Sequence, residues 1–165
     1  MPTPIAYISL GSNLGDSRQI LRAAMARLQG LADESMVRSS LWQTTPVDCP
    51  PGSPPFINAV AGLRARAGET PETLLRKLLA LEVEFGRRPK QIPNEPRPLD
   101  LDLICFGGET RDTPGLVLPH PRAPVRRFVL QPLSEIAPEL ILPGQDRTVR
   151  ELLAGLPADE TVVKA

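Results

Sequence analysis

The sequence has no excess of charge of either sign and no long apolar run. Nineteen Lys and Arg balance nineteen Asp and Glu, which gives a formal net charge of zero. Proteins that bind nucleic acid usually carry a basic excess, so the balance argues against a nucleic-acid partner, although it permits a small anion in a local basic cleft. No apolar run approaches the roughly 18 residues that cross a membrane, and we expect no membrane association.

Cysteine, histidine and aromatic residues are also scarce. The two cysteines, Cys49 and Cys105, form neither a CxxC pair nor a disulfide framework. Cys105 lies in an apolar, strand-like run and is expected to be a small core residue. The first residues lack the basic patch and apolar stretch of a secretory signal, so the expected compartment is the cytosol. With 165 residues, residues 1–165 are expected to form a single domain, which we take to be a monomer.

Proline, in contrast, is abundant. The 20 prolines gather at 46–55, 89–98 and 114–132. Because proline removes a backbone donor and interrupts helices and central strands, these stretches predict long loops. Long loops inside a compact domain are usually functional or disordered.

Hydrophobic periodicity predicts an α+β fold. Alternating or continuous apolar runs indicate strands at 5–10, 37–44, 57–63, 99–106 and 116–118. Helical spacing indicates a helix from about 17 to Gly30, one opened by Thr70 and Pro71 that ends at Gly86, a helical piece near 125–130, and a last helix from Thr148. The order strand-helix-strand-strand-helix-strand is the ferredoxin-like split βαβ arrangement, with a mostly antiparallel sheet and helices packed on one face.

The run Leu99-Asp100-Leu101-Asp102-Leu103 carries the sharpest chemical signal. In a strand, successive side chains point to opposite faces, so the leucines and Cys105 are expected on one face and both aspartates on the other. Two carboxylates without accompanying His or Cys favour Mg²⁺ over Zn²⁺, and Mg²⁺ usually arrives with a phosphate substrate. The alternative is a solvated strand face that carries two charges.

Basic residues flank this pair and favour the metal interpretation. They are Arg87, Arg88, Lys90 and Arg97 before it, and Arg122, Arg126 and Arg127 after it. Carboxylates with a ring of guanidinium groups are typical of a site for a metal-bound polyphosphate. The turn at 11–15 lacks the GK[ST] end of a Walker A loop, so any nucleotide must be held by the basic loops.

Single residues add weaker signals. Glu82 lies on an otherwise apolar helical stripe with Leu75, Leu78 and Leu79, so it needs a partner, unless it turns to solvent at the helix end. His120 is either a loop residue or a phosphate contact. Trp42, Phe56 and Phe128 are either core residues or, for the two phenylalanines at loop edges, rings that sandwich a flat heterocycle.

Taken together, these stretches resemble the 6-hydroxymethyl-7,8-dihydropterin pyrophosphokinase family over nearly the whole chain. The matching stretches are 6–16, 56–60, 81–87, 96–103, 118–120, 128–133 and 136–138, and the most specific is Pro-Arg-x-Leu-Asp-Leu-Asp at 96–102. The resemblance implies the ferredoxin-like fold and a reaction in which the pterin hydroxymethyl oxygen attacks the β-phosphorus of ATP and AMP leaves. The implied partners are ATP and 6-hydroxymethyl-7,8-dihydropterin.

The resemblance also implies roles for individual residues. Asp100 and Asp102 would bind two Mg²⁺ ions that bridge the ATP phosphates. The positions matched to ATP contacts are Glu82, Arg87, Arg97, His120 and Arg126, of which Arg87 and Arg97 join the aspartates as catalytic residues. The positions matched to the pterin pocket are Thr44, Val47, Phe56, Asn58 and Phe128.

The chain departs from the family pattern in places. Leu79 stands where many relatives have glutamine, Pro89 replaces a basic residue, Asn94-Glu95 replaces a pair that ends in glycine, and Phe56 replaces a common tyrosine. These changes bear on ATP affinity and loop closure. They leave as an alternative a catalytically impaired protein that only binds pterin and nucleotide. A metal-dependent phosphohydrolase is a further alternative, but we find no additional carboxylate or histidine cluster to support it.

Overall fold

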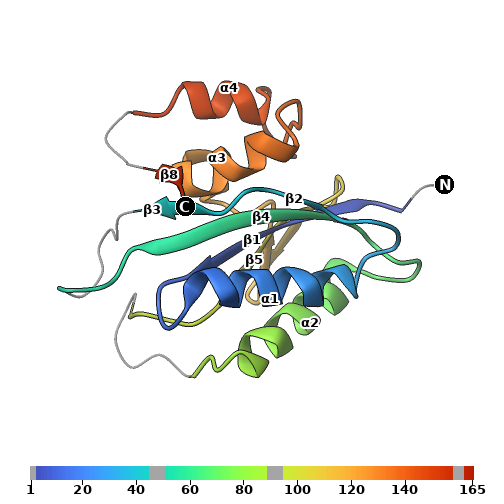
Figure 1. Cartoon of the computed structure of the whole chain (residues 1–165). Coiled ribbons are helices and arrows are strands. Elements are labelled where there is room, and N and C mark those ends of the chain that lie inside the picture. The colour runs from blue at the N-terminus through green and yellow to red at the C-terminus, as the bar shows by residue number, and fades with distance from the viewer. Residues whose placement is uncertain (1–2, 45–50, 89–94, 158–161) are drawn as a thin grey trace.

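The computed structural model describes residues 3–44, 51–88, 95–157 and 162–165 (Figure 1). Its main sheet has the order β5-β1-β4-β3-β8, and β2 also pairs with β4. The strands are β1 (Ile5–Ser12), β2 (Val37–Arg38), β3 (Trp42–Thr44), β4 (Phe56–Arg64), β5 (Asp100–Phe106) and β8 (Val162–Lys164), and a separate hairpin joins β6 (Arg111–Thr113) to β7 (Leu116–Leu118). The pairings of β1, β3, β4 and β5 are antiparallel, which confirms the ferredoxin-like prediction.

Helices cover both faces of the sheet, so the prediction that they pack on one face was wrong. The helices are α1 (Ser17–Gln29), α2 (Pro71–Glu84), α3 (Arg127–Ile136) and α4 (Val149–Ala154), with a 3-10 turn at Ala123–Val125. Figure 1 shows α1 and α2 on one side of the sheet and α3 and α4 on the other. Alternation along the strands supplies an apolar side chain to each face: Ile8 packs in the cluster with α1 and α2, while Tyr7 packs against the cluster with α3 and α4.

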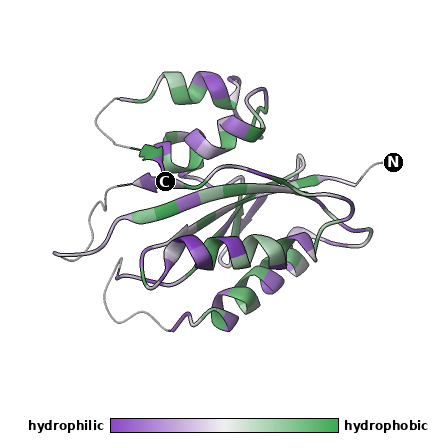
Figure 2. Cartoon of the chain, in the orientation of Figure 1, coloured by the Kyte–Doolittle hydropathy of each residue, from purple (hydrophilic) through white to green (hydrophobic). Residues whose placement is uncertain are grey.

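Local sequence sets the helix ends. Asp16 caps α1 by accepting a hydrogen bond from the Gln19 N–H, and Thr70 caps α2 with Pro71 in its first turn. Thr148 and Glu151 form a capping box at the start of α4, the helix predicted from Thr148. Leu74, Leu78 and Leu81 bury one stripe of α2, and Figure 2 shows both hydrophilic and hydrophobic residues along the helix. Among the described residues, the helices are all too short or too polar to span a bilayer.

The predicted strand at 37–44 is interrupted. Its two ends, β2 and β3, both pair with β4, but between them the Ser39 N–H donates to the Val60 carbonyl while the Ser39 Oγ accepts the Val60 N–H, each at 2.9 Å. The serine hydroxyl takes the place of a backbone carbonyl, a substitution that hydrophobic periodicity does not reveal. The short strands β6 and β8 were also not predicted.

Strand β5 follows the predicted alternation only to Leu103. The pairing of β1 with β5 shifts register at Tyr7 and Ile8, so that Ile8 lies opposite Leu103 and Tyr7 opposite Cys105. Cys105 is buried, as predicted, but it packs in the cluster with α3 and α4, on the face opposite the leucines. The irregularity has the effect of a β-bulge: after Leu103 it turns the Cys105 side chain to the face opposite the one that the alternation predicts.

Candidate functional site

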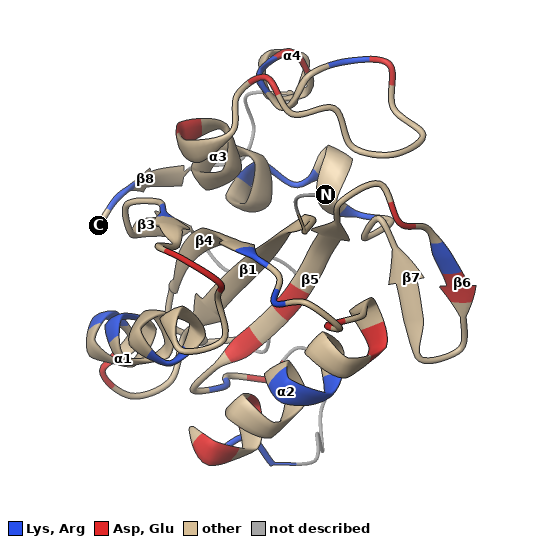
Figure 3. Ribbon diagram, turned by 90° about the vertical axis from the view of Figure 1, so that its right-hand side faces the viewer, with Lys and Arg blue, Asp and Glu red and all other residues tan. Residues whose placement is uncertain are grey.

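Asp100 and Asp102 share one face of β5, at the edge of the sheet next to α2 (Figure 3). Leu101 and Leu103, which alternate with them, are buried against α1 and α2. The aspartates therefore face the side of the sheet that carries α3, and both are half-buried. Opposite them on β1 are Gly11 and Ser9, respectively. This confirms that the two carboxylates share a face.

Two arginines converge on Asp100. The Arg87 Nη1 lies 3.0 Å from Asp100 Oδ1, and the Arg97 Nε lies 3.7 Å from Asp100 Oδ2. Arg87 also donates to the Leu99 carbonyl at 3.2 Å, which fixes the guanidinium at the start of β5. Its guanidinium pKa is raised, because the hydrogen bond and charge of Asp100 outweigh burial, and the charges of Glu82 and Asp102 add to this.

Glu82 lies beneath the strand, on α2. Its side chain is buried, and its Oε2 accepts a 2.7 Å hydrogen bond from the Leu101 N–H, between the two aspartates. The same oxygen lies 3.4 Å from Arg87 Nη1. Burial, with the charges of Asp100 and Asp102, raises its pKa to about 7 against the lowering effects of Leu101 and Arg87. The predicted need for a partner is met by a backbone amide and an arginine together.

The carboxyl pKa of Asp102 is raised for a similar reason. Burial and the negative charge of Asp100 raise its pKa to about 6, and Arg126, Arg97 and Arg87 act in the opposite direction. Among the described residues, no hydrogen bond to its carboxylate is found. Two neighbouring carboxylates that repel one another in a partly desolvated site are an environment that a bound cation would stabilise.

Arg97 and Arg126 each lie over an aromatic ring. The Arg97 Cζ is 5.3 Å from the Phe56 ring centroid, and the Arg126 Cζ is 5.3 Å from that of Phe128. These distances suit cation–π contacts. The Arg97 Nε is buried and makes no hydrogen bond to any described group. The Asp100 Oδ2 lies 3.7 Å from this nitrogen, so Arg97 is held there by an ion pair rather than by a hydrogen bond at Nε.

His120 follows β7 and lies on the same side as Arg126. The backbone N–H of His120 donates to the Ile104 carbonyl at 2.8 Å, and the ring Nδ1 accepts the backbone N–H of Arg122 at 3.2 Å. Burial lowers its pKa, as do the charges of Arg126 and Arg122, while Asp100 raises it. The neutral ring then carries its proton on Nε2, which is available as a donor.

Thr44 and Asn58 form a buried pair at the other side of the site. The Thr44 hydroxyl donates to Asn58 Oδ1 at 2.8 Å, and each residue is almost fully buried. Thr44 lies opposite Phe56 across β3 and β4, and Asn58 lies opposite Gly11 of β1. Residues that are directly opposite share a face, so this polar pair opens onto the same face as Asp100.

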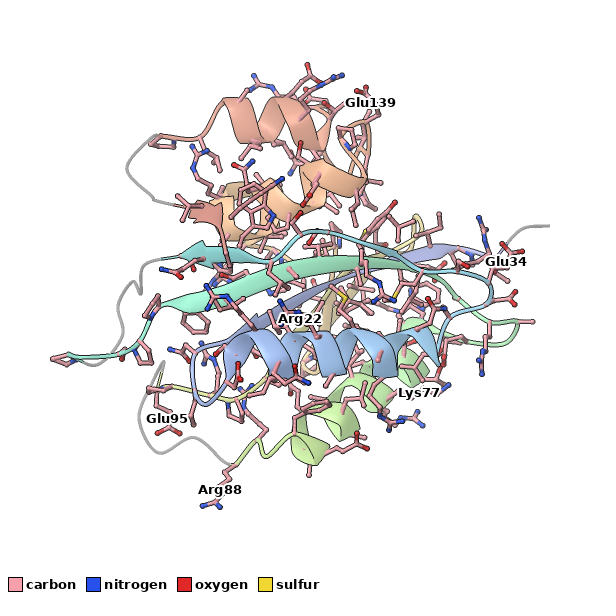
Figure 4. The ribbon with its side chains drawn as sticks, viewed as in Figure 1. Arg22, Glu34, Lys77, Arg88, Glu95 and Glu139 are labelled. Carbon is pink, nitrogen blue, oxygen red and sulfur yellow. The ribbon has the colours of Figure 1, made fainter. Side chains whose placement is uncertain are left out.

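Several residues singled out in the sequence lie elsewhere. Arg127 donates to the Leu156 and Pro157 carbonyls and so ties α3 to the segment after α4. Arg88 is exposed and extends away from the sheet (Figure 4). Leu79 is 50% exposed, so it does not belong to the buried stripe of α2 on which it was placed. Val47, Pro89, Lys90 and Asn94 lie outside the described residues.

Sequence reasoning did not single out Asn13, which the structure places beside Arg97. Its only signal in the sequence was a polar residue between two glycines directly after an apolar strand.

Within the described residues, no group of three or more His, Cys, Asp or Glu could hold a metal ion. A cation at Asp100 and Asp102 would therefore take its remaining ligands from water and from a bound phosphate, as Mg²⁺ commonly does.

Comparison with known proteins gives a consistent result. The sequence model of the 7,8-dihydro-6-hydroxymethylpterin-pyrophosphokinase (HPPK) family matches residues 7–138. The 2-amino-4-hydroxy-6-hydroxymethyldihydropteridine pyrophosphokinase of Pseudomonas aeruginosa is 40% identical over 152 residues, which cover 92% of this chain and 91% of that protein. The protein of the same name from Synechocystis sp. is 38% identical over 148 residues, covering 90% and 74% of the two chains.

Solved structures support the fold. A crystal structure of HPPK-DHPS in complex with substrates superposes with a TM-score of 0.72 at 11% identity, over 93% of this chain and 45% of that chain. The wild-type HPPK-DHPS of Plasmodium falciparum with pteroate gives a TM-score of 0.71 at 14% identity, over 92% of this chain and 42% of that chain. The chain thus spans less than half the length of these solved chains.

Proposed function

Because this chain belongs to the 7,8-dihydro-6-hydroxymethylpterin-pyrophosphokinase family, we propose that it transfers the β,γ-diphosphate of ATP to 6-hydroxymethyl-7,8-dihydropterin. The products are the pterin diphosphate and AMP, and the reaction is a step of folate biosynthesis. The observation that carries this assignment is the placement of Asp100 and Asp102 on one face of β5, with Arg87 and Arg97 at Asp100.

The residues present fit Mg²⁺ at the two aspartates. The raised pKa of Asp102 reflects its burial and then the charge of the neighbouring Asp100 carboxylate, and the arginines compensate these only in part. When bound, two Mg²⁺ ions would neutralise phosphate charge and hold the ATP oxygens in line for transfer. Asp100 and Asp102 would hold them, each through its carboxylate.

ATP would occupy the space bounded by α2, the end of β7 and the start of α3. Arg87 is fixed by Asp100 and by the Leu99 carbonyl, so its guanidinium is oriented before a phosphate arrives. The Arg97 guanidinium, held between Asp100 and the Phe56 ring, supplies a second positive charge. The neutral His120 ring, after β7, and the Arg126 guanidinium, before α3, supply further donors. Glu82 of α2 supports β5 by accepting the Leu101 N–H.

The pterin would bind between Phe56 and Phe128, with Thr44 and Asn58 at its edge. Thr44 donates to Asn58 Oδ1, so this contact orients the Asn58 amide and leaves its NH₂ group toward the site. A flat heterocycle between two rings would meet the guanidinium groups of Arg97 and Arg126, which lie over those rings. Each arginine would thus lie between the heterocycle site and the phosphate site.

In the transfer, the hydroxymethyl oxygen forms a bond to the β-phosphorus as the bond between that phosphorus and the α,β-bridging oxygen breaks. The electron pair of the broken bond leaves with AMP, and the hydroxyl proton passes to water. The chain contributes position and charge: Arg87 and Arg97 stabilise the diphosphate as negative charge shifts along it, and the aromatic rings align the acceptor.

Both hydrophobic clusters share the main sheet, which supports a single domain over residues 1–165.

The test is a product assay with purified protein, ATP, Mg²⁺ and 6-hydroxymethyl-7,8-dihydropterin. We expect AMP and pterin diphosphate in equal amounts, with product formation lost in EDTA. ADP as the product would indicate transfer of a single phosphoryl group and contradict the proposal. Binding of pterin without product would identify the catalytically impaired alternative.

A further inference from the structure

Asn13 is a buried amide at the junction of three segments. It follows the last residue of β1, and it is 1% exposed. Its side chain contacts the segment before β5 and the segment before β4, which are far apart in the sequence. A buried amide requires partners for its polar atoms, and here those partners are main-chain groups of the site.

The first contact is reciprocal. The Asn13 N–H donates to the Arg97 carbonyl at 3.1 Å, and the Arg97 N–H donates to Asn13 Oδ1 at 2.9 Å. The pairing of β1 with β5 ends at Gly11 and Asp100. Beyond that point the Asn13 side-chain Oδ1 accepts from the Arg97 N–H as a ladder carbonyl would, while the Asn13 backbone N–H binds the Arg97 carbonyl.

The second contact fastens the neighbouring segment. Asn13 Nδ2 donates to the Pro54 carbonyl at 3.3 Å, two residues before Phe56 begins β4. The Arg97 guanidinium lies over the Phe56 ring. One side chain therefore holds the backbone beneath a phosphate-binding arginine and the backbone beside the ring on which that arginine rests.

We propose that Asn13 is a positioning residue for diphosphate transfer, which sets the Arg97 guanidinium between Asp100 and Phe56. The inference rests on the proposed function, because Arg97 acts there on the transferred diphosphate. Asn13 supplies an acceptor and a donor from one planar group, so it can hold both segments at once. Its own atoms need not touch either substrate.

The test compares Asn13→Ala with a matched control, Ser12→Ala. Ser12 is the adjacent residue, is 0% exposed, and donates a 2.8 Å hydrogen bond to Ser17 Oγ. Each substitution removes a buried hydrogen-bonding side chain at the end of β1, but only Asn13 binds Arg97 and Pro54. We expect Asn13→Ala to lower kcat by about 10- to 100-fold, since small displacements of a catalytic group have effects of this size. Ser12→Ala should keep kcat within about twofold of wild type, because it disturbs no group of the site.

A double-mutant cycle with Arg97→Ala separates positioning from general damage. If Asn13 acts through Arg97, Asn13→Ala causes no further loss of kcat in the Arg97→Ala background, whereas independent effects would multiply. The affinity for a Mg²⁺ complex of a non-hydrolysable ATP analogue is measured for all four proteins, and the same non-additivity is expected.

The outcomes are distinct. If Asn13→Ala keeps kcat within about twofold of wild type, the inference is overturned. The same holds if Asn13→Ala lowers kcat by an equal factor in the wild-type and Arg97→Ala backgrounds. Both results would leave the proposed function intact. If the wild-type protein forms no pterin diphosphate, the proposed function fails. The cycle in analogue affinity then still decides whether Asn13 positions Arg97.

Discussion

Asn58 of β4 and Asp100 of β5 lie at the same level of the sheet, each directly opposite Gly11 of β1. Neighbouring strands are about 4.8 Å apart, so the two residues are separated by roughly 10 Å across a residue without a side chain. The proposed pterin pocket at Asn58 and the proposed metal site at Asp100 therefore lie on either side of Gly11, which has no side chain to separate them. The acceptor oxygen and the transferred diphosphate would meet above Gly11.

Gly11→Ala is expected to weaken pterin binding more than nucleotide binding. An added Cβ would lie 3.2 Å from Asn58 Nδ2 and 3.7 Å from Phe56 Cδ1. Displacement of these groups would cost about 1–3 kcal/mol, or roughly one to two orders of magnitude in pterin affinity. Fluorescence titration with the pterin measures this. Gly108→Ala is the control, because nothing lies within 4 Å of its added Cβ, and equal affinities in the two variants would contradict the prediction.

Glu82→Gln is expected to stabilise the metal-free protein at alkaline pH. Burial raises the pKa of Glu82 from 4.5 to about 7. An acid whose folded-state pKa is raised favours folding below its unfolded pKa, and this contribution is lost as pH rises through about 7. Glutamine removes that loss and still accepts from the Leu101 N–H. Chemical denaturation should show no gain near pH 4 and a gain of roughly 2–3 kcal/mol above pH 8.

The control for this prediction is Glu84→Gln on the same helix. Glu84 forms an exposed pair with Arg27, and such pairs contribute about 0–1 kcal/mol, so its effect should be small. A Glu82→Gln protein with the same pH dependence of unfolding as wild type would show that Glu82 is not the group responsible.

Asparagine substitutions at Asp100 and Asp102 are expected to change the free energy of unfolding differently, although both should abolish turnover. Asp102 carries a carboxylate whose pKa is raised to about 6 by burial and by Asp100. Its ionised form therefore destabilises the metal-free fold at pH 8, and Asp102→Asn should raise the free energy of unfolding by about 1–2 kcal/mol. The gain should vanish as pH falls below the unfolded pKa. Asp100→Asn should bring no gain, because it deprives Arg87 of its 3.0 Å partner.

Both variants should lose turnover, because each removes a carboxylate from the proposed metal site. Denaturation curves with and without EDTA, together with AMP release, measure the two effects. An Asp102→Asn protein that turns over at the wild-type rate would remove Asp102 from the site.

The sequence predicted the features that depend on local patterns. The starts of α2 at Thr70 and of α4 at Thr148 and the alternation around Asp100 and Asp102 are set by neighbouring residues, and the structure confirms them. Features that depend on tertiary contacts were missed. The register shift that turns Cys105 to the other face arises in the pairing with β1, which periodicity in a single strand does not reveal.

The residues of the candidate site show the same division. Arg97 could be placed near Asp100 because only two residues separate them, and Arg87 because it belongs to the same run of basic residues before the pair. Arg127 could not be separated from Arg126 by sequence, although one binds carbonyls after α4 and the other lies over Phe128. The part of Asn13 was missed because its partners are main-chain groups of residues that are distant in sequence.

The most direct test of the account is the number of metal ions that the two aspartates hold with nucleotide. Mn²⁺ can be titrated in place of Mg²⁺ in the presence of α,β-methylene ATP, with free Mn²⁺ followed by electron paramagnetic resonance. We predict two tightly bound ions per chain in the wild-type protein and a loss of tight binding in Asp100→Asn and Asp102→Asn. Equal Mn²⁺ binding in all three proteins would contradict the assignment of the metal site to β5.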